Sequence, residues 1–282
     1  MGGARVRIVA AVDAGLIKMN GAGMTTPRRL DGKRALVTAG AQGIGAAITR
    51  ELLAAGCSVF VHYRSSAAAA AALLSGAPVA GCCHTLTADL TQPGESERLV
   101  EAAVGALGGL DILVNNAGSL VARRTLTEAD DDFWSEVMEL NLGTMRRVSR
   151  AAAPHLVKAA ETTGGASVVN LSSLAGRKGG HPGSLAYSTA KGAVLTFTRA
   201  LAAELGPSGV RVNAVAPGLI LGTAFHATHT SEASAQATIA GIPLGRAGRP
   251  EDVARAVVFL AGEYDGFITG ATLDINGGVY SA

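Results

Sequence analysis

The sequence predicts one α/β domain with a doubly wound parallel sheet and helices on both faces. Short apolar runs typical of strands alternate repeatedly with longer helical runs, and the loops between them are short. This alternation is typical of parallel sheets in which each helix returns the chain to the next strand. With 282 residues, 48% hydrophobic but only 4% aromatic, the chain can fill a large core with Ala, Val, Leu and Ile.

The first predicted unit is a strand over 34–38, a glycine-rich turn over 39–45 and a helix over 46–55. Strand, glycine turn and helix form the context in which such glycines bind a dinucleotide. Gly43 lets the backbone approach a pyrophosphate, and Gly45 lets the helix pack close to the strand. The N–H groups at the helix start attract the phosphates. The unit therefore predicts a Rossmann-like fold.

The end of the next predicted strand, 58–63, bears on which dinucleotide binds. NAD-binding folds carry an acidic residue about 20 residues past the glycines, which binds the ribose 2′-hydroxyl. Here Arg64 and Ser65 stand in that region, and no acid occurs between Glu51 and Asp89. Because a guanidinium binds a 2′-phosphate that a carboxylate would repel, NADP(H) is favoured and NAD(H) stays possible.

Polar residues follow the later strands as well. Asp89, at the end of a strand over 83–90, is expected either to bind the adenine amino group or to cap a turn. A helix over 95–107 and a strand from 111 follow, and that strand runs into a polar turn ending at Gly118. In open α/β sheets the cofactor lies at such strand ends.

The second half of the chain carries the residues best suited to catalysis. One long helix is expected over 132–155, with Asn141 midway, followed by a strand over 166–173 that ends at Ser173. After a flexible loop over 176–180, a helix carries Tyr187 and Lys191, which share one face because they are four residues apart. A nearby ammonium favours the phenolate form of tyrosine. The pair can therefore serve proton transfer.

These motifs together resemble the short-chain dehydrogenase/reductase family over residues 31–282, most closely its 3-oxoacyl-(acyl-carrier-protein) reductase-like branch. The residues that carry the resemblance are the turn from Thr38 to Gly45, Asn115 to Gly118, Ser173, Tyr187 with Lys191, Arg211 to Gly218 and Ile268 to Gly278. One departure is Ala39, which stands where the family's turn has its first glycine. Because the carboxyl ends of the strands converge on one edge of a doubly wound sheet, Gly43, Asp89, Asn116, Ser173 and Tyr187 are expected near one crevice.

The resemblance implies a catalytic group of Asn141, Ser173, Tyr187 and Lys191. Tyr187 would be the general acid in ketone reduction, and Ser173 would bind the substrate oxygen. Lys191 would hold the nicotinamide ribose and lower the Tyr187 pKa, and Asn141 would hold a proton-relaying water. Ser172 is the alternative for the serine role.

The turn and the resemblance together imply the cofactor contacts. These are Thr38, Gly40, Gln42, Gly43, Ile44, Gly45, Arg64, Ser65, Asp89, Leu90, Asn116, Ala117, Gly118, Tyr187, Lys191, Pro217, Gly218 and Ile220. Thr223 is shifted by one position from the family's carboxamide-binding threonine.

The ends of the chain and the segment over the substrate are assigned from composition. Residues 1–30 are expected to be a disordered extension or the product of a start site placed before Met24, so the domain spans 31–282. A mobile substrate lid is expected over about 219–243. Its His226 and His229 are expected to be solvated, so no metal site is predicted. The resemblance further implies a homotetramer or homodimer.

Composition excludes several classes of function. A net charge of +2 gives no argument for nucleic-acid binding, and no apolar run reaches the length of about 18–20 residues that a membrane span needs. Three cysteines, two of them adjacent, suggest no disulfide framework and fit a cytoplasmic location.

The function predicted from these observations is NADPH-dependent reduction of a ketone, a 3-oxoacyl thioester or a similar carbonyl. A basic patch suited to an acyl carrier protein can come from Arg123, Arg124, Arg146, Arg147, Arg177 and Lys178. A sugar or polyol dehydrogenase is the alternative enzyme. A non-catalytic dinucleotide-binding regulator is the alternative of another class.

Overall fold

The computed structural model describes residues 30–223, 228, 230–262 and 266–281. They form a parallel sheet of seven strands in the order β3-β2-β1-β4-β5-β6-β7. The strands are β1 (Arg34–Val37), β2 (Ser58–Tyr63), β3 (Cys83–Thr87), β4 (Ile112–Asn115), β5 (Ala166–Leu171), β6 (Val210–Pro217) and β7 (Thr272–Ile275). The predicted doubly wound sheet is confirmed.

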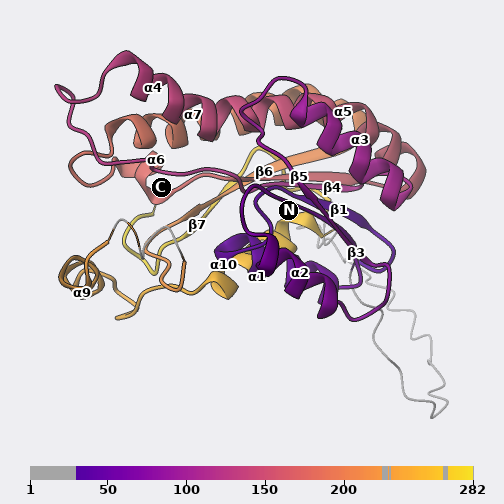
Figure 1. Cartoon of the computed structure of the whole chain (residues 1–282), viewed down its shortest axis with the longest axis horizontal. Coiled ribbons are helices and arrows are strands. Elements are labelled where there is room, and N and C mark those ends of the chain that lie inside the picture. The colour runs from indigo at the N-terminus through magenta and orange to yellow at the C-terminus, as the bar shows by residue number, and fades with distance from the viewer. Residues whose placement is uncertain (1–29, 224–227, 229, 263–265, 282) are drawn as a thin grey trace, which may run out of the picture.

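Helices cover both faces of this sheet (Figure 1). On one face lie α3 (Glu95–Leu107), α4 (Asp131–Met138), α5 (Thr144–Thr163) and α7 (Leu185–Leu205). The other face carries α1 (Gly43–Ala54), α2 (Ala67–Ser75) and α10 (Pro250–Ala261). At the carboxyl end of the sheet lie the short α6 (Leu174–Lys178) and α9 (Glu232–Ala240).

The core consists of two main apolar clusters, one on each side of the sheet. Ile48 and Leu52 of α1 pack with Val257 of α10 on one side. On the other side Leu99 of α3 packs with Leu156 of α5. These side chains are completely buried or nearly so. Because parallel strands are buried on both faces, they read as continuous apolar runs, which is why their positions were predictable.

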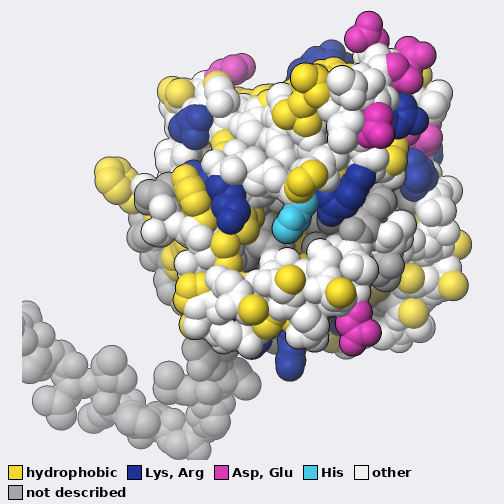
Figure 2. All heavy atoms as spheres, turned by 90° about the vertical axis from the view of Figure 1, so that its left-hand side faces the viewer, with side chains coloured by type: hydrophobic (Ala, Val, Ile, Leu, Met, Phe, Trp, Pro, Cys, Tyr) yellow, Lys and Arg dark blue, Asp and Glu magenta, His cyan; other side chains and the backbone are white. Residues whose placement is uncertain are grey.

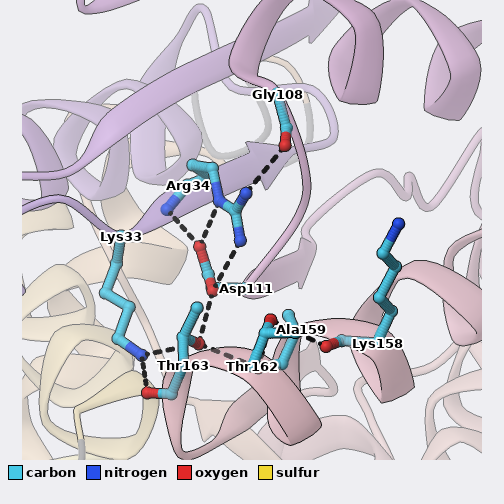
Figure 3. A network of polar contacts seen from close by, with 8 residues as sticks. All are labelled: Lys33, Arg34, Gly108, Asp111, Lys158, Ala159, Thr162 and Thr163. Atoms are coloured by element: carbon cyan, nitrogen blue, oxygen red, sulfur yellow. Dashed lines mark hydrogen bonds and ion pairs between the residues drawn. The ribbon is translucent and has the colours of Figure 1, made fainter.

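A polar network fastens the amino ends of the strands, opposite the predicted site (Figure 3). The Asp111 carboxylate is 1% exposed and accepts hydrogen bonds from the Arg34 guanidinium and backbone N–H and from the Thr163 hydroxyl. Lys33 donates to Thr163 in turn. Burial alone would raise the pKa of Asp111, but these hydrogen bonds outweigh it and lower the pKa. The network joins β1, β4 and the end of α5.

The expected single helix over 132–155 is wrong in one respect. The helical path runs from α4 through a π-helical segment, Glu139–Gly143, into α5. Asn141 lies in this segment and is completely buried rather than exposed. π-helical turns within α-helices often mark functional sites, since the extra residue redirects side chains. The periodicity of apolar residues in the sequence does not reveal one residue inserted into a helix.

Two segments expected to be flexible contain helices. Part of the predicted loop over 176–180 belongs to α6, where Gly176 packs so closely on α7 that a Cβ there would lie 2.5 Å from the Lys191 carbonyl carbon. The predicted lid contains α9. His226 and His229 lie outside the described residues, as does Met24. Leu30, assigned to the extension, is 2% exposed and packs in the core. No described helix is long and apolar enough to span a bilayer.

Candidate active site

The turn after β1 forms a cradle that suits a pyrophosphate. Ala39 and Gly43 both have positive φ, +48° and +52°. A Cβ at Gly45 would lie 2.1 Å from the Ala39 carbonyl oxygen, so only glycine fits there. No side chain caps the start of α1, and its first turn carries no acid. The helix start is therefore open to an anion, as a dinucleotide phosphate requires.

The turn after β4 is tied directly to this cradle. The Asn116 side chain donates to the carbonyl oxygens of Thr38 and Ala39. The Thr38 hydroxyl accepts from the backbone N–H groups of Asn116 and Ala117. Thr38 and Asn116 thus join the two turns through hydrogen bonds that involve both side chains, so in this structure they shape the cradle rather than project from it.

The end of β2 presents the residues expected to choose between dinucleotides. Arg64 and Ser65 are both exposed. The next residue, Ser66, donates to the side-chain oxygen of Gln42 in the cradle, 2.9 Å away. Thr223, in the segment after β6, approaches the same turn, since a Cβ at Gly43 would lie 3.4 Å from its methyl group. Sequence reasoning missed Ser66, and no motif would have marked it.

The remaining predicted cofactor residues lie at the same ends of the strands. Asp89 accepts hydrogen bonds from the backbone and hydroxyl of Thr91, and these contacts lower its pKa. It therefore caps a turn with one carboxylate oxygen. Leu90 and Ile220 are buried. Pro217 ends β6, and the Gly218 N–H donates to Ile275 at the end of β7.

Ser173 and Tyr187 meet at the centre of the site. Ser173 follows β5 and caps α6, and its side chain forms a hydrogen bond with the Tyr187 hydroxyl. Burial raises the pKa of Tyr187, and the hydrogen bond with Ser173 opposes that rise. Ser172, the alternative serine, is 5% exposed and donates to the Lys191 carbonyl oxygen. Ser173 is therefore the serine positioned beside the phenol.

Lys191 lies one helical turn beyond Tyr187 and is 4% exposed. Its ammonium donates to the Leu171 carbonyl oxygen, 2.9 Å away, and lies 5.8 Å from the centre of the Tyr187 ring. Burial lowers the pKa of Lys191 to about 8. Burial of the phenol dominates the Tyr187 pKa in this structure, and the lowering expected from Lys191 stays a prediction.

Asn141 and Lys191 converge on Gly118. A Cβ at Gly118 would lie 2.6 Å from the Asn141 amide oxygen and 2.9 Å from the Lys191 ammonium. The Asn141 amide is bound to the protein, because it accepts from the Ser119 N–H and donates to the Ser119 and Val137 carbonyl oxygens. Asn141 thus fixes the loop after β4 at the predicted catalytic group. All four predicted catalytic residues lie in one region.

A pocket of about 620 Å³, here called the substrate-side pocket, opens at the same end of the molecule. Its lining residues are Arg123, His181, Pro182, Thr228, Thr230, Ser231 and Ser234. Figure 2 shows this end, where Lys and Arg side chains flank a hollow that also holds a histidine. Among the described residues, the lining has basic and hydroxyl groups and no carboxylate, so it suits a polar or anionic ligand.

Three of the six residues in the predicted basic patch are paired with carboxylates. Arg124 pairs with Asp130 and lies over the Phe133 ring, Arg147 pairs with Glu139, and Arg177 pairs with Asp274. Arg146 and Lys178 are exposed. Among the residues that the structure describes, no group of three or more His, Cys, Asp or Glu side chains is arranged to hold a metal ion.

Comparison with known proteins agrees with this geometry. The family profile described as Enoyl-(Acyl carrier protein) reductase matches residues 38–280. The 3-oxoacyl-(acyl-carrier-protein) reductase FabG of Vibrio cholerae serotype O1 is 36% identical, covering 89% of this chain and 98% of its own length.

Two solved structures are also similar. One is the NADH-dependent reductase A1-R′ responsible for alginate metabolism, at TM-score 0.82 and 33% identity over 90% of this chain and 100% of its own. The other is a short-chain dehydrogenase from Burkholderia cenocepacia J2315 in complex with NADP, at TM-score 0.81 and 34% identity over the same shares. The fold, the site and these relatives define an NAD(P)-dependent oxidoreductase. The chain belongs to the short-chain dehydrogenase/reductase family, in its FabG-like branch.

Proposed function

We propose that the protein reduces a ketone to a secondary alcohol with NADPH, using Tyr187 as the proton donor. One observation carries this proposal: the Tyr187 hydroxyl is hydrogen-bonded to Ser173, and the Lys191 ammonium lies beside the same ring. Proton transfer to a carbonyl substrate requires such an arrangement, whereas dinucleotide binding by a regulator does not. The arrangement therefore favours an enzyme over a non-catalytic regulator.

The chain's own residues suit the reductive direction. The bound dinucleotide supplies the hydride. Because burial raises the pKa of Tyr187, its phenol stays protonated at neutral pH and can donate a proton to the developing alkoxide. Ser173 donates a hydrogen bond to the same oxygen and stabilises its charge. Lys191, with a pKa of about 8, is charged at neutral pH and favours transfer of the phenolic proton.

The preference for NADPH rests on Arg64, exposed at the end of β2 beside the cradle. In wild type we expect kcat/KM to be higher with NADPH than with NADH. Arg64→Asp should lower kcat/KM for NADPH by about tenfold or more, since a charge-assisted contact contributes about 1.5–3 kcal/mol, and should spare NADH. Steady-state rates with both cofactors measure this. A wild-type preference for NADH would refute the proposed role of Arg64.

The substrate class follows from the relatives and the substrate-side pocket. A FabG relative favours a 3-oxoacyl thioester, while the hydroxyl side chains of Thr228, Ser231 and Ser234 also suit hydrogen bonds to a sugar or polyol. A panel with an acetoacetyl thioester, ketoses and simple diketones separates these candidates. We propose a 3-oxoacyl thioester as the substrate, and a sugar or polyol dehydrogenase is the alternative.

The test of the mechanism is Tyr187→Phe, assayed with NADPH on every substrate that wild type reduces. Loss of a positioned proton donor should lower kcat by a factor of about 10²–10⁴, while dissociation constants for the dinucleotide stay close to wild type. Ser172→Ala serves as the matched control for Ser173→Ala, and only the latter should lower kcat strongly. Wild-type turnover by Tyr187→Phe would refute the mechanism.

We also propose that the protein works in the cytoplasm as a homotetramer or homodimer. Leu273 of the edge strand β7 is 38% exposed, and Phe259 of α10 is 40% exposed. Phe267, between these elements, is 94% exposed. Exposed large apolar side chains on adjacent elements favour association between subunits.

A further inference from the structure

His62 lies near the end of β2, is 3% exposed, and spans the gap between two parts of the cofactor site. Its Nδ1 is 3.0 Å from the Ala39 backbone nitrogen in the cradle. Its Nε2 is 3.0 Å from the Ala88 carbonyl oxygen, next to Asp89. Its own carbonyl oxygen accepts from the Gly40 N–H. One residue therefore links the phosphate side of the site to the β3 end.

These contacts determine the protonation state and the tautomer of the His62 imidazole. The Ala39 N–H can only donate, so Nδ1 must carry a lone pair. The Ala88 carbonyl can only accept, so Nε2 must carry the proton. Both bonds form only with the neutral Nε2–H tautomer. An imidazolium would turn two N–H groups toward each other and break the bond to the cradle.

The bond to Ala39 matters because of the conformation there. Ala39 has φ of +48°, a region in which residues with a Cβ are strained. Its carbonyl oxygen lies against Gly45 and accepts from Asn116. The position of Ala39 therefore affects both the start of α1 at Gly45 and the turn that holds Asn116. A buried hydrogen bond to its N–H holds a conformation that the backbone alone would disfavour.

We propose that neutral His62 is a positioning residue for the cofactor, and that protonation of its imidazole weakens dinucleotide binding. The inference rests on the proposed dinucleotide site but adds an acid-sensitive element to it. His62 itself touches backbone groups of the cradle and acts through them.

The surroundings of His62 favour the neutral form. Burial lowers the pKa of His62, while its hydrogen bond to Ala88 and the Asp89 carboxylate act in the opposite direction. Glu95 and Arg98 of α3 also act on it, but they pair with each other.

The other elements packed against β2 add no close charge pair. On β1, Arg34 is held by Asp111 at the far end of the strand, and α2 carries no titratable side chain. On β3, where Leu86 pairs with His62, the titratable side chains are Cys83 and His84. On α1, Arg50 lies 3.9 Å from the exposed Glu251, and Glu51 is the other charge. Because the dinucleotide binds the folded protein, affinity is full above the lowered pKa of His62, which lies below the ordinary 6.5, and falls as pH drops below that lowered pKa.

Conservative variants separate the two contacts. His62→Asn places an acceptor near the Nδ1 position and keeps the bond to Ala39, whereas His62→Gln reaches the Nε2 position and keeps only the bond to Ala88. His62→Leu removes both. Dissociation constants for NAD+ and NADP+ are measured by calorimetry from pH 5 to pH 8. NAD+ lacks the 2′-phosphate, so its pH dependence is free of phosphate titration.

We expect His62→Gln and His62→Leu to weaken both dinucleotides by about tenfold at pH 8, the loss that one buried hydrogen bond entails. His62→Asn should stay within about threefold of wild type and should bind NAD+ equally from pH 5 to pH 8. Wild-type affinity should fall at acid pH. At saturating cofactor, kcat of all variants should change little, because Tyr187 is untouched.

Several results overturn the inference. These are equal loss in His62→Asn and His62→Leu, wild-type affinity in His62→Gln, or a flat wild-type profile for NAD+. If His62→Leu does not fold, the Asn and Gln variants and the wild-type pH profile still decide. Failure of wild type to bind any dinucleotide at pH 8 would instead refute the proposed cofactor site.

Discussion

At the scale of single residues, burial of the Lys191 ammonium destabilises the fold, and its neighbours do not fully compensate for this. It is 4% exposed, and its ammonium has one hydrogen bond to the Leu171 carbonyl oxygen. Burial lowers its pKa from 10.5 to about 8. A residue selected for stability alone would not be a charged amine in this position. We attribute its presence to the proposed reaction.

Replacing this amine should therefore stabilise the fold while abolishing activity. Since one pKa unit corresponds to about 1.4 kcal/mol, Lys191→Met should raise the unfolding free energy at pH 7 by about 2 kcal/mol after loss of the bond to Leu171. Between pH 8 and 10.5 the unfolded wild type binds more protons, so its stability rises with pH and the difference shrinks.

Urea unfolding from pH 7 to pH 10 measures this effect. The control is Lys158→Met, on the exposed surface of α5, which should change the unfolding free energy by less than about 0.5 kcal/mol. A Lys191→Met variant less stable than wild type at pH 7 would contradict the prediction, since it would mean that the amine stabilises the folded state.

Residue spacing in the sequence indicated the catalytic group because Tyr187 and Lys191 share a helical face and Ser173 ends a strand. The structure brings these residues together as expected. It also contains features that residue spacing in the sequence cannot predict. The raised Tyr187 pKa depends on burial, and the contacts of His62 depend on backbone groups far from it in sequence. Neither leaves a motif.

At the scale of elements, the relation of α6 to α7 places Ser173 beside Tyr187. Gly176 of α6 faces the backbone of α7, and a Cβ there would lie 2.5 Å from the Lys191 carbonyl carbon. Ser173 is the N-cap of the same short helix. Any separation of α6 from α7 would therefore shift Ser173 relative to the phenol.

Gly176→Ala should thus reduce kcat more than it raises KM, and should lower the unfolding free energy by about 1–3 kcal/mol through overpacking. Gly192→Ala on the facing helix is the matched control, because its Cβ would meet the Gly176 carbonyl oxygen at an ordinary 3.4 Å. Steady-state kinetics and urea unfolding of both variants test this. Equal effects of the two substitutions would refute the packing argument.

Element boundaries were predictable where apolar runs were continuous. The bounds of β2 and α3 agree with the sequence-based ones because glycines and polar residues flank both. The π-helical segment Glu139–Gly143 and helix α6 were missed. The first adds one residue to an otherwise regular helix, and the second contains a glycine that propensity counts against a helix but close packing requires.

At the scale of the whole molecule, the two ends of the sheet have different tasks. The amino ends carry the buried Asp111 network that fastens β1, β4 and α5. The carboxyl ends carry the cradle, the catalytic group and the substrate-side pocket. This division lets the site keep strained and buried polar groups, such as Ala39 and Lys191, because stability is supplied at the opposite end.

The other task at this scale is assembly, which the edge strand β7 should control. Among the described strands it pairs only with β6, and α10 packs against it. If this edge forms the subunit interface, Leu273→Glu should convert the assembly to smaller species, because a charge would be buried at an apolar contact. Light scattering coupled to size exclusion measures the mass.

The control substitution for assembly is Val79→Glu. Val79 is 60% exposed and precedes β3, the strand at the opposite edge of the sheet. It should leave the mass unchanged. Circular dichroism of both variants confirms that they are folded. A wild-type monomer, or a Leu273→Glu variant with wild-type mass, would show that this edge does not hold subunits together. Dissociation of Leu273→Glu alone would place the interface at β7, since the two substitutions add the same charge to opposite edges of one sheet.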